Sequence, residues 1–273
     1  MILVFGKTGQ VGSALAKKSN VMALGRDEAN LENPQECCDA IIKHSPDAVI
    51  NAAAFTAVDE AESQPHLAGQ INGIAPGYMA RACAALQIPL IHLSTDYVFA
   101  GEGDHAYQPD DQTAPLNAYG KSKLQAENLI ENSGCVYGII RTSWVFSYQG
   151  KNFLKTMLTL SENVAEISVI DDQYGGPTPA LALADAALNM AYGLIERPQL
   201  AGIYHLSGKP DVSWYDFAEE ILRSHSKKIQ LHSVSTKDYK SKVRRPKNSR
   251  LNCDSTASTF NIKRPSWRDF LRE

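Results

Sequence analysis

The stretch ILVFGKTGQVG, residues 2–12, decides the fold of this chain. Four apolar residues are followed at once by glycines at positions 6, 9 and 12, and then by a helical run. Glycine at a strand-to-helix turn lets backbone N–H groups approach a pyrophosphate, which then lies on the positive end of the helix. The second apolar run, VMAL, follows at the expected distance. Gly6, Gly9 and Gly12 therefore predict a dinucleotide-binding turn, with a purely structural tight turn as the alternative.

The same strand-helix rhythm continues through the first half of the chain. The apolar runs ILVF, VMAL, AVIN, PLIHLS and VYGIIRT are separated by longer amphipathic stretches. Strands that do not alternate between polar and apolar residues are buried on both faces, which indicates a parallel sheet between two layers of helices. We therefore predict an α/β fold with a doubly wound, Rossmann-like sheet that binds NAD(P).

The rhythm loosens after about residue 145. We predict a dinucleotide-binding domain over residues 1–147 and a smaller C-terminal α/β lobe over 148–273 that binds the substrate. Some segments of this second part, such as residues 201–207, are expected to return to the first domain. No internal repeat accompanies this change.

Composition excludes several classes of partner. The 273 residues carry 27 basic and 30 acidic side chains, a net charge of -3, which gives no global field for nucleic acid or an anionic membrane. The start of the chain lacks a basic segment before a long apolar run, and the apolar helix at 180–195 is too short for a bilayer. Five scattered cysteines match neither a zinc spacing nor a disulfide framework. We expect a cytoplasmic protein with reduced thiols, a small-molecule substrate and no metal site.

The end of the second strand bears on the choice of cofactor. An acidic residue there usually binds the ribose 2′-hydroxyl, whereas an arginine accommodates a 2′-phosphate. This chain has Gly25 followed by Arg26, with Asp27 next to them. We predict NADPH, with NADH still possible, and with Arg26 as a plain surface residue the alternative.

A second set of polar residues is predicted at the same edge of the sheet. Ser94, Thr95 and Asp96 end the fourth strand, where ligands of open α/β sheets bind. Tyr119 and Lys123 are four residues apart and share one face of the next helix. A nearby ammonium lowers the pKa of a phenol, so we expect Lys123 to make Tyr119 a useful acid. Spacing alone leaves an ordinary surface pair as the alternative.

Eight segments together resemble the extended short-chain dehydrogenase/reductases across almost the whole length. They are FGKTGQVG, INAAAFTAVDEAE, LSTDYVFAG, PLNAYGKSK, RTSWVF, NFLKTML, DQYGGPTP and RPKNSRL. The resemblance implies hydride transfer from NAD(P)H to the C4 ketone of a dTDP-deoxysugar, with Tyr119 as proton donor.

The resemblance also implies roles for individual positions. Thr95, Tyr119 and Lys123 match the catalytic triad, and Thr95, Asp96 and Trp144 match residues that hold the deoxysugar nucleotide. The implied cofactor set has a pyrophosphate part, an adenine part and a part beside the nicotinamide. Its members are Gly6, Gly9, Gln10, Val11, Gly12, Gly25, Arg26, Asn30, Leu31, Ala54, Phe55, Thr56, Leu93, Tyr119 and Lys123.

Several of these positions keep a second interpretation. Trp144 could be a core aromatic residue, Asn51 is expected to end a strand, and the basic stretch 237–250 suits either a solvated face or a nucleotide diphosphate. Some relatives dimerise through magnesium held by glutamates, but Ala14 and Leu181 occupy two of those positions here. We therefore expect a monomer or a homodimer without a magnesium bridge.

Two rival functions remain open. One is a related reductase or epimerase that makes another 6-deoxyhexose. The other is a regulatory subunit similar to the methionine adenosyltransferase beta subunit, which would bind the cofactor without a reductase role.

Overall fold

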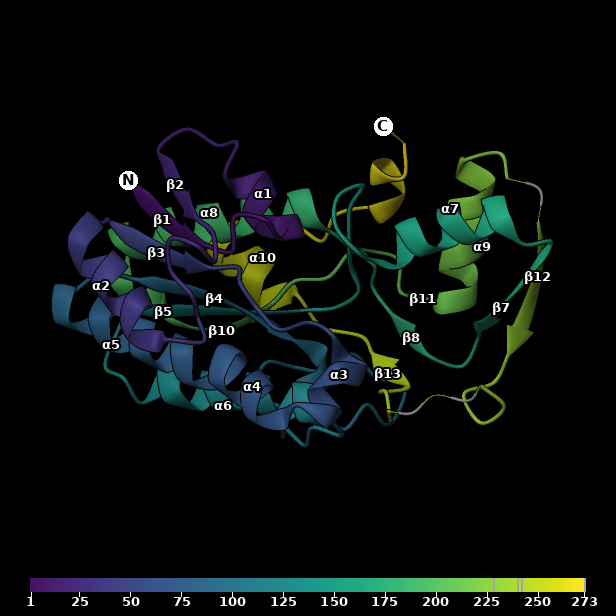
Figure 1. Cartoon of the computed structure of the whole chain (residues 1–273), viewed down its shortest axis with the longest axis horizontal. Helices are drawn as coiled ribbons and strands as arrows, with labels where there is room; N and C mark the ends of the chain where they lie inside the picture. Colours follow the sequence, from purple (N-terminus) through teal and green to yellow (C-terminus); the bar gives the residue numbers. More distant parts are fainter. Residues whose placement is uncertain (228, 240, 242, 273) are drawn as a thin grey trace.

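A six-stranded parallel sheet forms the centre of the molecule, in the strand order β10-β5-β4-β3-β1-β2 (Figure 1). The computed structural model describes residues 1–227, 229–239, 241 and 243–272. The strands are β1 (Ile2–Phe5), β2 (Val21–Leu24), β3 (Ala48–Asn51), β4 (Leu90–Thr95), β5 (Tyr137–Thr142) and β10 (Gly202–His205). This parallel arrangement confirms the predicted doubly wound, Rossmann-like fold.

Helices bury both faces of this sheet, which explains why its strands are apolar without alternation. In β1, Leu3 and Phe5 enter one core while Ile2 and Val4 enter the other. The first core lies under α2 (Pro34–His44), α5 (Ala75–Leu86) and α6 (Ala118–Glu131). The second lies under α1 (Gln10–Leu15), α8 (Ala180–Glu196) and α10 (Asp254–Phe260).

A helical segment with a π turn connects β3 to α5. It comprises α3 (Val58–Ser63), α4 (Pro65–Gly69) and the π turn Gln70–Ile74. Asn72 in this turn is fully buried, accepts a hydrogen bond from the Phe55 backbone N–H at 2.7 Å and donates to the Phe55 carbonyl at 3.0 Å. The π turn thereby fixes the loop that follows β3 at the carboxyl edge of the sheet.

A smaller lobe lies to one side of the sheet (Figure 1). Its helices α7 (Phe153–Asn163) and α9 (Trp214–Ser224) pack with a parallel strand pair around a separate core that contains Phe217 and Trp267. That pair consists of β7 (Glu166–Ile170) and β12 (Gln230–Val234), and the remaining short strands are β6 (Val145–Phe146), β8 (Tyr174–Gly175), β9 (Thr178–Pro179), β11 (Val212–Ser213) and β13 (Asn248–Ser249).

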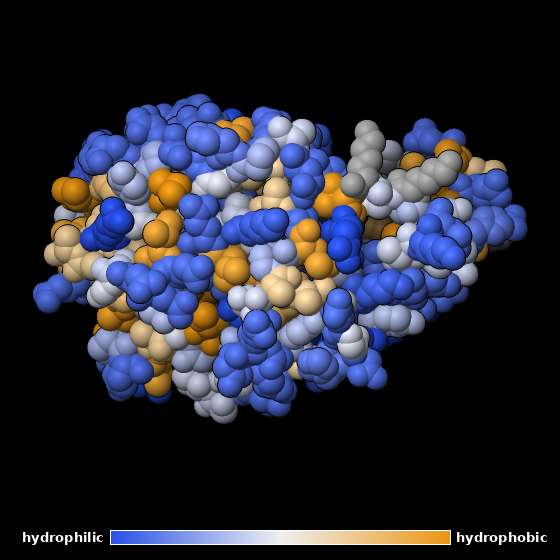
Figure 2. Space-filling view, turned by 90° about the horizontal axis from the view of Figure 1, so that it is seen from below, coloured by the Kyte–Doolittle hydropathy of each residue, from blue (hydrophilic) through white to orange (hydrophobic). Residues whose placement is uncertain are grey.

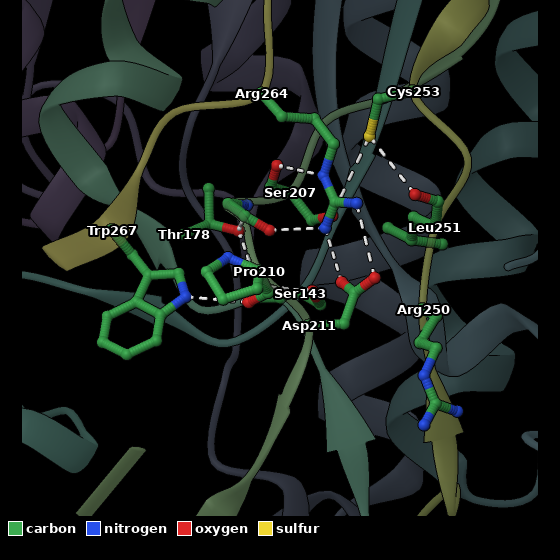
Figure 3. A network of polar contacts seen from close by, with 12 residues as sticks. Ser143, Thr178, Ser207, Pro210, Asp211, Arg250, Leu251, Cys253, Arg264 and Trp267 are labelled. Atoms are coloured by element: carbon green, nitrogen blue, oxygen red, sulfur yellow. Dashed lines mark hydrogen bonds and ion pairs between the residues drawn. The ribbon is translucent and has the colours of Figure 1, made fainter. Parts of the chain in front are cut away.

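The chain crosses between the two parts several times. β10 pairs with β5 in the central sheet, while α8 and α10 cover a face of that sheet. After α10, Arg264 donates hydrogen bonds to the carbonyls of Ser207 and Gly208. It also forms an ion pair with Asp211, as Figure 3 shows. These contacts join the last segment of the chain to the segment that follows β10. We propose that the dinucleotide-binding domain ends at residue 147 and that the segment around 201–207 returns to it.

The surface seen in Figure 2 mixes hydrophilic and hydrophobic residues, and the hydrophobic ones form small separate groups on that face. Within the described residues, none of the helices has the length and apolar character required to cross a membrane.

Candidate functional site

A cavity of about 430 Å³ lies at the carboxyl edge of the sheet, beside the glycine turn. Gly6 has φ +99°, and a Cβ there would come within 2.7 Å of the Ala53 backbone nitrogen. A Cβ on Gly12 would come within 1.9 Å of the Gly6 carbonyl oxygen. At Gly6 and Gly12 the backbone therefore packs so closely that only glycine fits, as a turn that binds a pyrophosphate requires.

Most of the predicted cofactor residues line this cavity, but two do not. Gly12 packs against Gly6 instead, and Phe55 packs against the first core. The predicted residues that do line it are Gly6, Gly9, Gln10, Val11, Gly25, Arg26, Asn30, Leu31, Ala54, Thr56, Leu93, Tyr119 and Lys123.

Several lining residues were missed by the sequence reasoning. Lys151 and Gly150 come from the loop after β6, and Thr142 comes from the end of β5. The remaining ones are Thr8, Ala29, Ala52, Ala53, Ile71, Val145 and Leu183, while Ser94 had been placed at this edge without a cofactor role. The adjacent pair Gly150-Lys151 is a signal in the sequence that could have indicated this loop, because glycine permits a tight turn and lysine carries a cationic side chain.

Gln10 fastens this loop to the glycine turn. Its Oε1 accepts hydrogen bonds from Ser147 Oγ at 2.9 Å and from Asn152 Nδ2 at 2.8 Å. Gly150 has φ +72°, so the loop turns back over the cavity there. Residues more than 130 positions apart thus form one wall of the site.

The far end of the cavity lies at the end of β2. Glu28 Oε2 accepts a hydrogen bond from the Gly25 N–H at 2.9 Å, which ties down the loop. The Arg26 side chain is 70% exposed and lies 3.6 Å from Glu32. Arg26 is therefore free to turn towards a bound anion, since an exposed ion pair of this length holds it weakly.

Tyr119 and Lys123 both line the cavity from α6. The helix begins where Asn117 Oδ1 accepts from the Gly120 N–H at 2.9 Å and Glu62 accepts from the Ala118 N–H at 2.6 Å. A Cβ on Gly120 would come within 2.2 Å of the Tyr97 carbonyl oxygen, so this glycine allows the first turn to lie close to the end of β4. The caps and the glycine together set the position of Tyr119.

The pKa of Tyr119 does not follow the prediction. Burial, with a further contribution from Asp96, raises it to about 12, while the Thr95 hydroxyl lowers it. The expected lowering by Lys123 is absent, because burial also lowers the pKa of Lys123 to about 7. The Lys123 Nζ instead lies 3.0 Å from His92 Nε2.

A buried polar cluster lies next to Lys123, between α6 and the sheet. Glu127, one turn along α6, forms a buried ion pair with Arg141 and accepts a hydrogen bond from Ser94 Oγ at 2.5 Å. Its charge raises the pKa of Lys123, although burial has the larger effect. Arg141 also donates to the Pro109 carbonyl at 2.8 Å, so all three nitrogens of its guanidinium donate hydrogen bonds.

Thr95 and Asp96 lie just beyond the cavity lining, at the end of β4. Thr95 Oγ1 donates to Asp96 Oδ1 at 3.1 Å, and the second carboxylate oxygen of Asp96 is buried without a hydrogen-bond partner among the described residues. Burial raises the pKa of Asp96 to about 7. An unpaired buried oxygen of this kind suits a ligand hydroxyl.

Trp144 is both strained and stacked. Its backbone has φ +49°, its ring stacks on Trp214 with centroids 3.6 Å apart, and a Cβ on Gly175 would meet the ring at 2.9 Å. A left-handed backbone is rare for a bulky residue and often marks a functional position.

A second cavity, of about 580 Å³, lies between the loop at 100–103 and the basic stretch. Arg244, Arg245 and Lys247 line it together with Gln173 and Tyr239. Arg245 pairs with Asp59 at 3.0 Å and Lys247 with Asp172 at 2.8 Å. Lys240 and Lys242 of this stretch lie outside the described residues.

Across residues 1–227, 229–239, 241 and 243–272, there is no group of three or more His, Cys, Asp or Glu side chains that could hold a metal ion. All five cysteines are free thiols.

Comparison with known proteins places this geometry in context. The chain matches, over residues 1–273, a family described as RmlD substrate binding domain. It is 39% identical to a dTDP-4-dehydrorhamnose reductase of Salmonella typhimurium, with 97% of this chain and 94% of the relative covered.

Two solved structures have the same fold over nearly the whole chain. A dTDP-4-dehydrorhamnose reductase from Clostridium acetobutylicum superposes with a TM-score of 0.92 at 33% identity, covering 99% of this chain and 96% of that one. The reductase from Bacillus anthracis, in complex with NADP, also gives 0.92, at 32% identity and the same coverage.

Proposed function

This chain belongs to the family described as RmlD substrate binding domain, and from that premise we propose that it reduces dTDP-4-dehydro-L-rhamnose to dTDP-L-rhamnose with NADPH. The observation that carries the proposal is the convergence of Tyr119, Lys123 and the glycine turn on one cavity. Its support comes from the reductase relatives, one of them solved with NADP.

We propose that the cofactor occupies the 430 Å³ cavity along its length. The turn at Gly6, Gly9 and Gln10 would hold the pyrophosphate, Asn30 and Leu31 would flank the adenine, and Arg26 would meet a 2′-phosphate. The close packing at Gly6 and Gly12, which leaves no room for a Cβ at either position, fits this group. The reduced nicotinamide, when bound, supplies the hydride.

The residues of the chain would position the ketone and supply the proton. Tyr119 would donate its proton to the oxygen at C4 as that oxygen gains negative charge. The Thr95 hydroxyl, which already lowers the pKa of Tyr119, would hydrogen-bond the same oxygen. This interaction would strengthen in the transition state. Lys123 would hold the nicotinamide ribose and, once protonated, lower the pKa of Tyr119.

The substrate would lie between the sheet and the smaller lobe. The free oxygen of Asp96 would accept a sugar hydroxyl, and Trp144, held by Trp214, would form an apolar wall. The basic residues of the second cavity suit the nucleotide diphosphate, because one guanidinium group can donate two parallel hydrogen bonds to a phosphate.

We propose a cytoplasmic enzyme that works as a monomer or as a homodimer without a magnesium bridge. Leu181, one of the two positions where some relatives carry a magnesium ligand, is 47% exposed on α8 and offers no oxygen ligand. No role with nucleic acid or a membrane is proposed.

The test is oxidation of NADPH, and separately of NADH, by the purified protein with dTDP-4-dehydro-L-rhamnose, followed by NMR identification of the sugar. Oxidation with dTDP-L-rhamnose as the product is the expected result. A different 6-deoxyhexose would indicate the related reductase or epimerase. Cofactor binding without oxidation would favour the regulatory subunit.

A further inference from the structure

His92 occupies a buried position between two polar side chains of different elements. It lies on β4, and its Nδ1 is 3.2 Å from Asn51 Nδ2 on β3, while its Nε2 is 3.0 Å from Lys123 Nζ on α6. All three residues are at most 1% exposed. The atoms of these residues that face one another are therefore removed from water, and a donor buried there needs an acceptor.

The orientation of Asn51 decides where the imidazole carries its proton. The Ala53 backbone N–H donates to Asn51 Oδ1 at 3.1 Å, so the amide nitrogen of Asn51 must be the atom that faces His92. An amide nitrogen only donates, and His92 Nδ1 must then accept with its lone pair. Burial is the larger of two causes that keep the pKa of His92 well below its usual range, the other being the charge of Lys123 when it is protonated. The ring is therefore neutral, and its single proton is on Nε2.

That proton points at Lys123. A protonated lysine has three hydrogens and no lone pair, so it cannot accept from His92 Nε2–H. The 3.0 Å contact between Nε2 and Nζ is a hydrogen bond only if Lys123 is a neutral amine. The burial that lowers the pKa of Lys123 to about 7 acts in the same direction.

The other charged groups around Lys123 do not reverse this arrangement. Glu127 on the same helix is neutralised by Arg141 of β5 at 2.7 Å. Tyr119, one turn earlier, stays a neutral phenol because its pKa is raised to about 12. Lys151, from the loop after β6, lines the same cavity and adds a positive charge. Of these groups, Glu127 favours the ammonium form of Lys123, and burial of Lys123 outweighs it.

We propose that Asn51 and His92 are positioning residues that hold Lys123 as a neutral amine before the cofactor binds, and that cofactor binding takes up one proton at Lys123. The second half of this proposal rests on the proposed function of the cavity. The proton comes from solvent onto the Nζ lone pair, and no other bond breaks. Because Nε2–H then faces an ammonium, Lys123 is directed away from His92 towards Tyr119 and the ligand.

The first test needs no ligand. ¹⁵N NMR of histidine-labelled, cofactor-free protein at pH 8 reports the tautomer of His92, whose signal is assigned by its loss in His92→Gln. The expected result is a protonated Nε2 with an unprotonated Nδ1. A protonated Nδ1 would overturn the proposal.

The second test measures the proton directly. Calorimetric titration with NADP⁺ in two buffers of different ionisation enthalpy gives the protons taken up on binding. We expect about one proton per chain at pH 8 and a clear loss of that uptake at pH 6, where Lys123 is already protonated. Absence of uptake at pH 8 would overturn the proposal.

Asn51→Asp reverses the direction of the hydrogen bonds that run from Asn51 through His92 to Lys123, without changing the shape of the side chain. The new carboxylate still accepts from Ala53 N–H but now also accepts from His92 Nδ1–H, so Nε2 becomes an acceptor for a protonated Lys123. Proton uptake at pH 8 should therefore be lost, and uptake equal to that of the native protein would contradict the proposal.

Asn128→Asp, an exposed residue on α6, is the matched control for the added charge and should keep the native uptake. If the buried variant does not fold, the tautomer and the uptake of the native chain still decide. Native uptake without turnover of the dTDP-sugar would refute the reductase function but leave this proposal intact.

Discussion

Two regions of the cofactor cavity differ in what lines them: backbone atoms form one end, and titratable side chains form the other. At the glycine turn, backbone atoms approach so closely that a Cβ on Gly12 would come within 1.9 Å of a carbonyl oxygen. At the other end, titratable side chains meet: Tyr119 and the buried Lys123 line the cavity, and the buried Asp96 lies just beyond it. The first end selects by shape and should respond to added atoms. The second end selects by charge and should respond to isosteric changes and to pH.

The largest expected effect is at the side-chain end. Tyr119→Phe removes only the hydroxyl that would donate the proton, so turnover should fall by about 10²–10⁴-fold. NADPH affinity should change little, because the ring that lines the cavity remains. Steady-state kinetics and a separate binding titration measure the two quantities. Tyr78→Phe, on the exposed surface of α5, is the matched control. An unchanged rate in Tyr119→Phe would refute the proton-donor role.

Asp96 should give this end a dependence of stability on pH. The unfolded chain releases the Asp96 proton near pH 4, whereas burial holds the proton in the folded chain up to about pH 7. The free energy of unfolding contributed by this group is therefore full below about pH 4 and is lost as the pH rises through 7.

Asp96→Asn removes that loss while keeping the shape. Relative to the native chain, its free energy of unfolding should rise between pH 4 and pH 8 by about 2–4 kcal/mol. Urea denaturation at both pH values measures the difference, and Lys123 contributes equally to both proteins. The exposed Asp110→Asn is the control. The same stability difference at both pH values would show that Asp96 is ionised normally.

The glycine end should respond to a single methyl group. Gly12→Ala forces the helix start away from Gly6, and overpacking of this kind costs about 1–3 kcal/mol. Affinity for NADPH and for NADH should fall together by about tenfold or more, because both share the pyrophosphate. Gly69→Ala is the matched control, since its Cβ would lie 3.5 Å from the nearest atom, a flexible Gln125 side chain. Undiminished binding by Gly12→Ala would mean that the turn yields easily.

The sequence predicts the glycine end better than the side-chain end, for a physical reason. The strand, the glycines and the helix are neighbours along the chain, and burial on both faces leaves a local pattern in the strands. The spacing of Tyr119 and Lys123 likewise follows from the helical period.

The direction of the pKa shifts could not be predicted from this local pattern. It depends on how deeply Tyr119 and Lys123 are buried once α6 packs on the sheet. His92 lies 31 residues from its partner Lys123, so that contact also depends on the fold. The Gln10 contacts that bring Lys151 to the cavity span more than 130 residues. His92 did leave one signal, a histidine within the apolar run PLIHLS, where a buried polar residue needs a partner.

The smallest expected effect tests whether Arg26, which follows β2 on the glycine side of the cavity, distinguishes the two cofactors. Arg26→Ala should weaken NADPH more than NADH, by up to about fivefold, because a highly exposed guanidinium contributes at most about 1 kcal/mol. Lys151→Gln is the informative partner variant. Lys151 lies in the loop that Gln10 fastens over the glycine turn, so its loss should weaken the binding of both cofactors to the same extent. Equal losses in Arg26→Ala would remove Arg26 from cofactor selection and leave the backbone turn as the main source of affinity at this end.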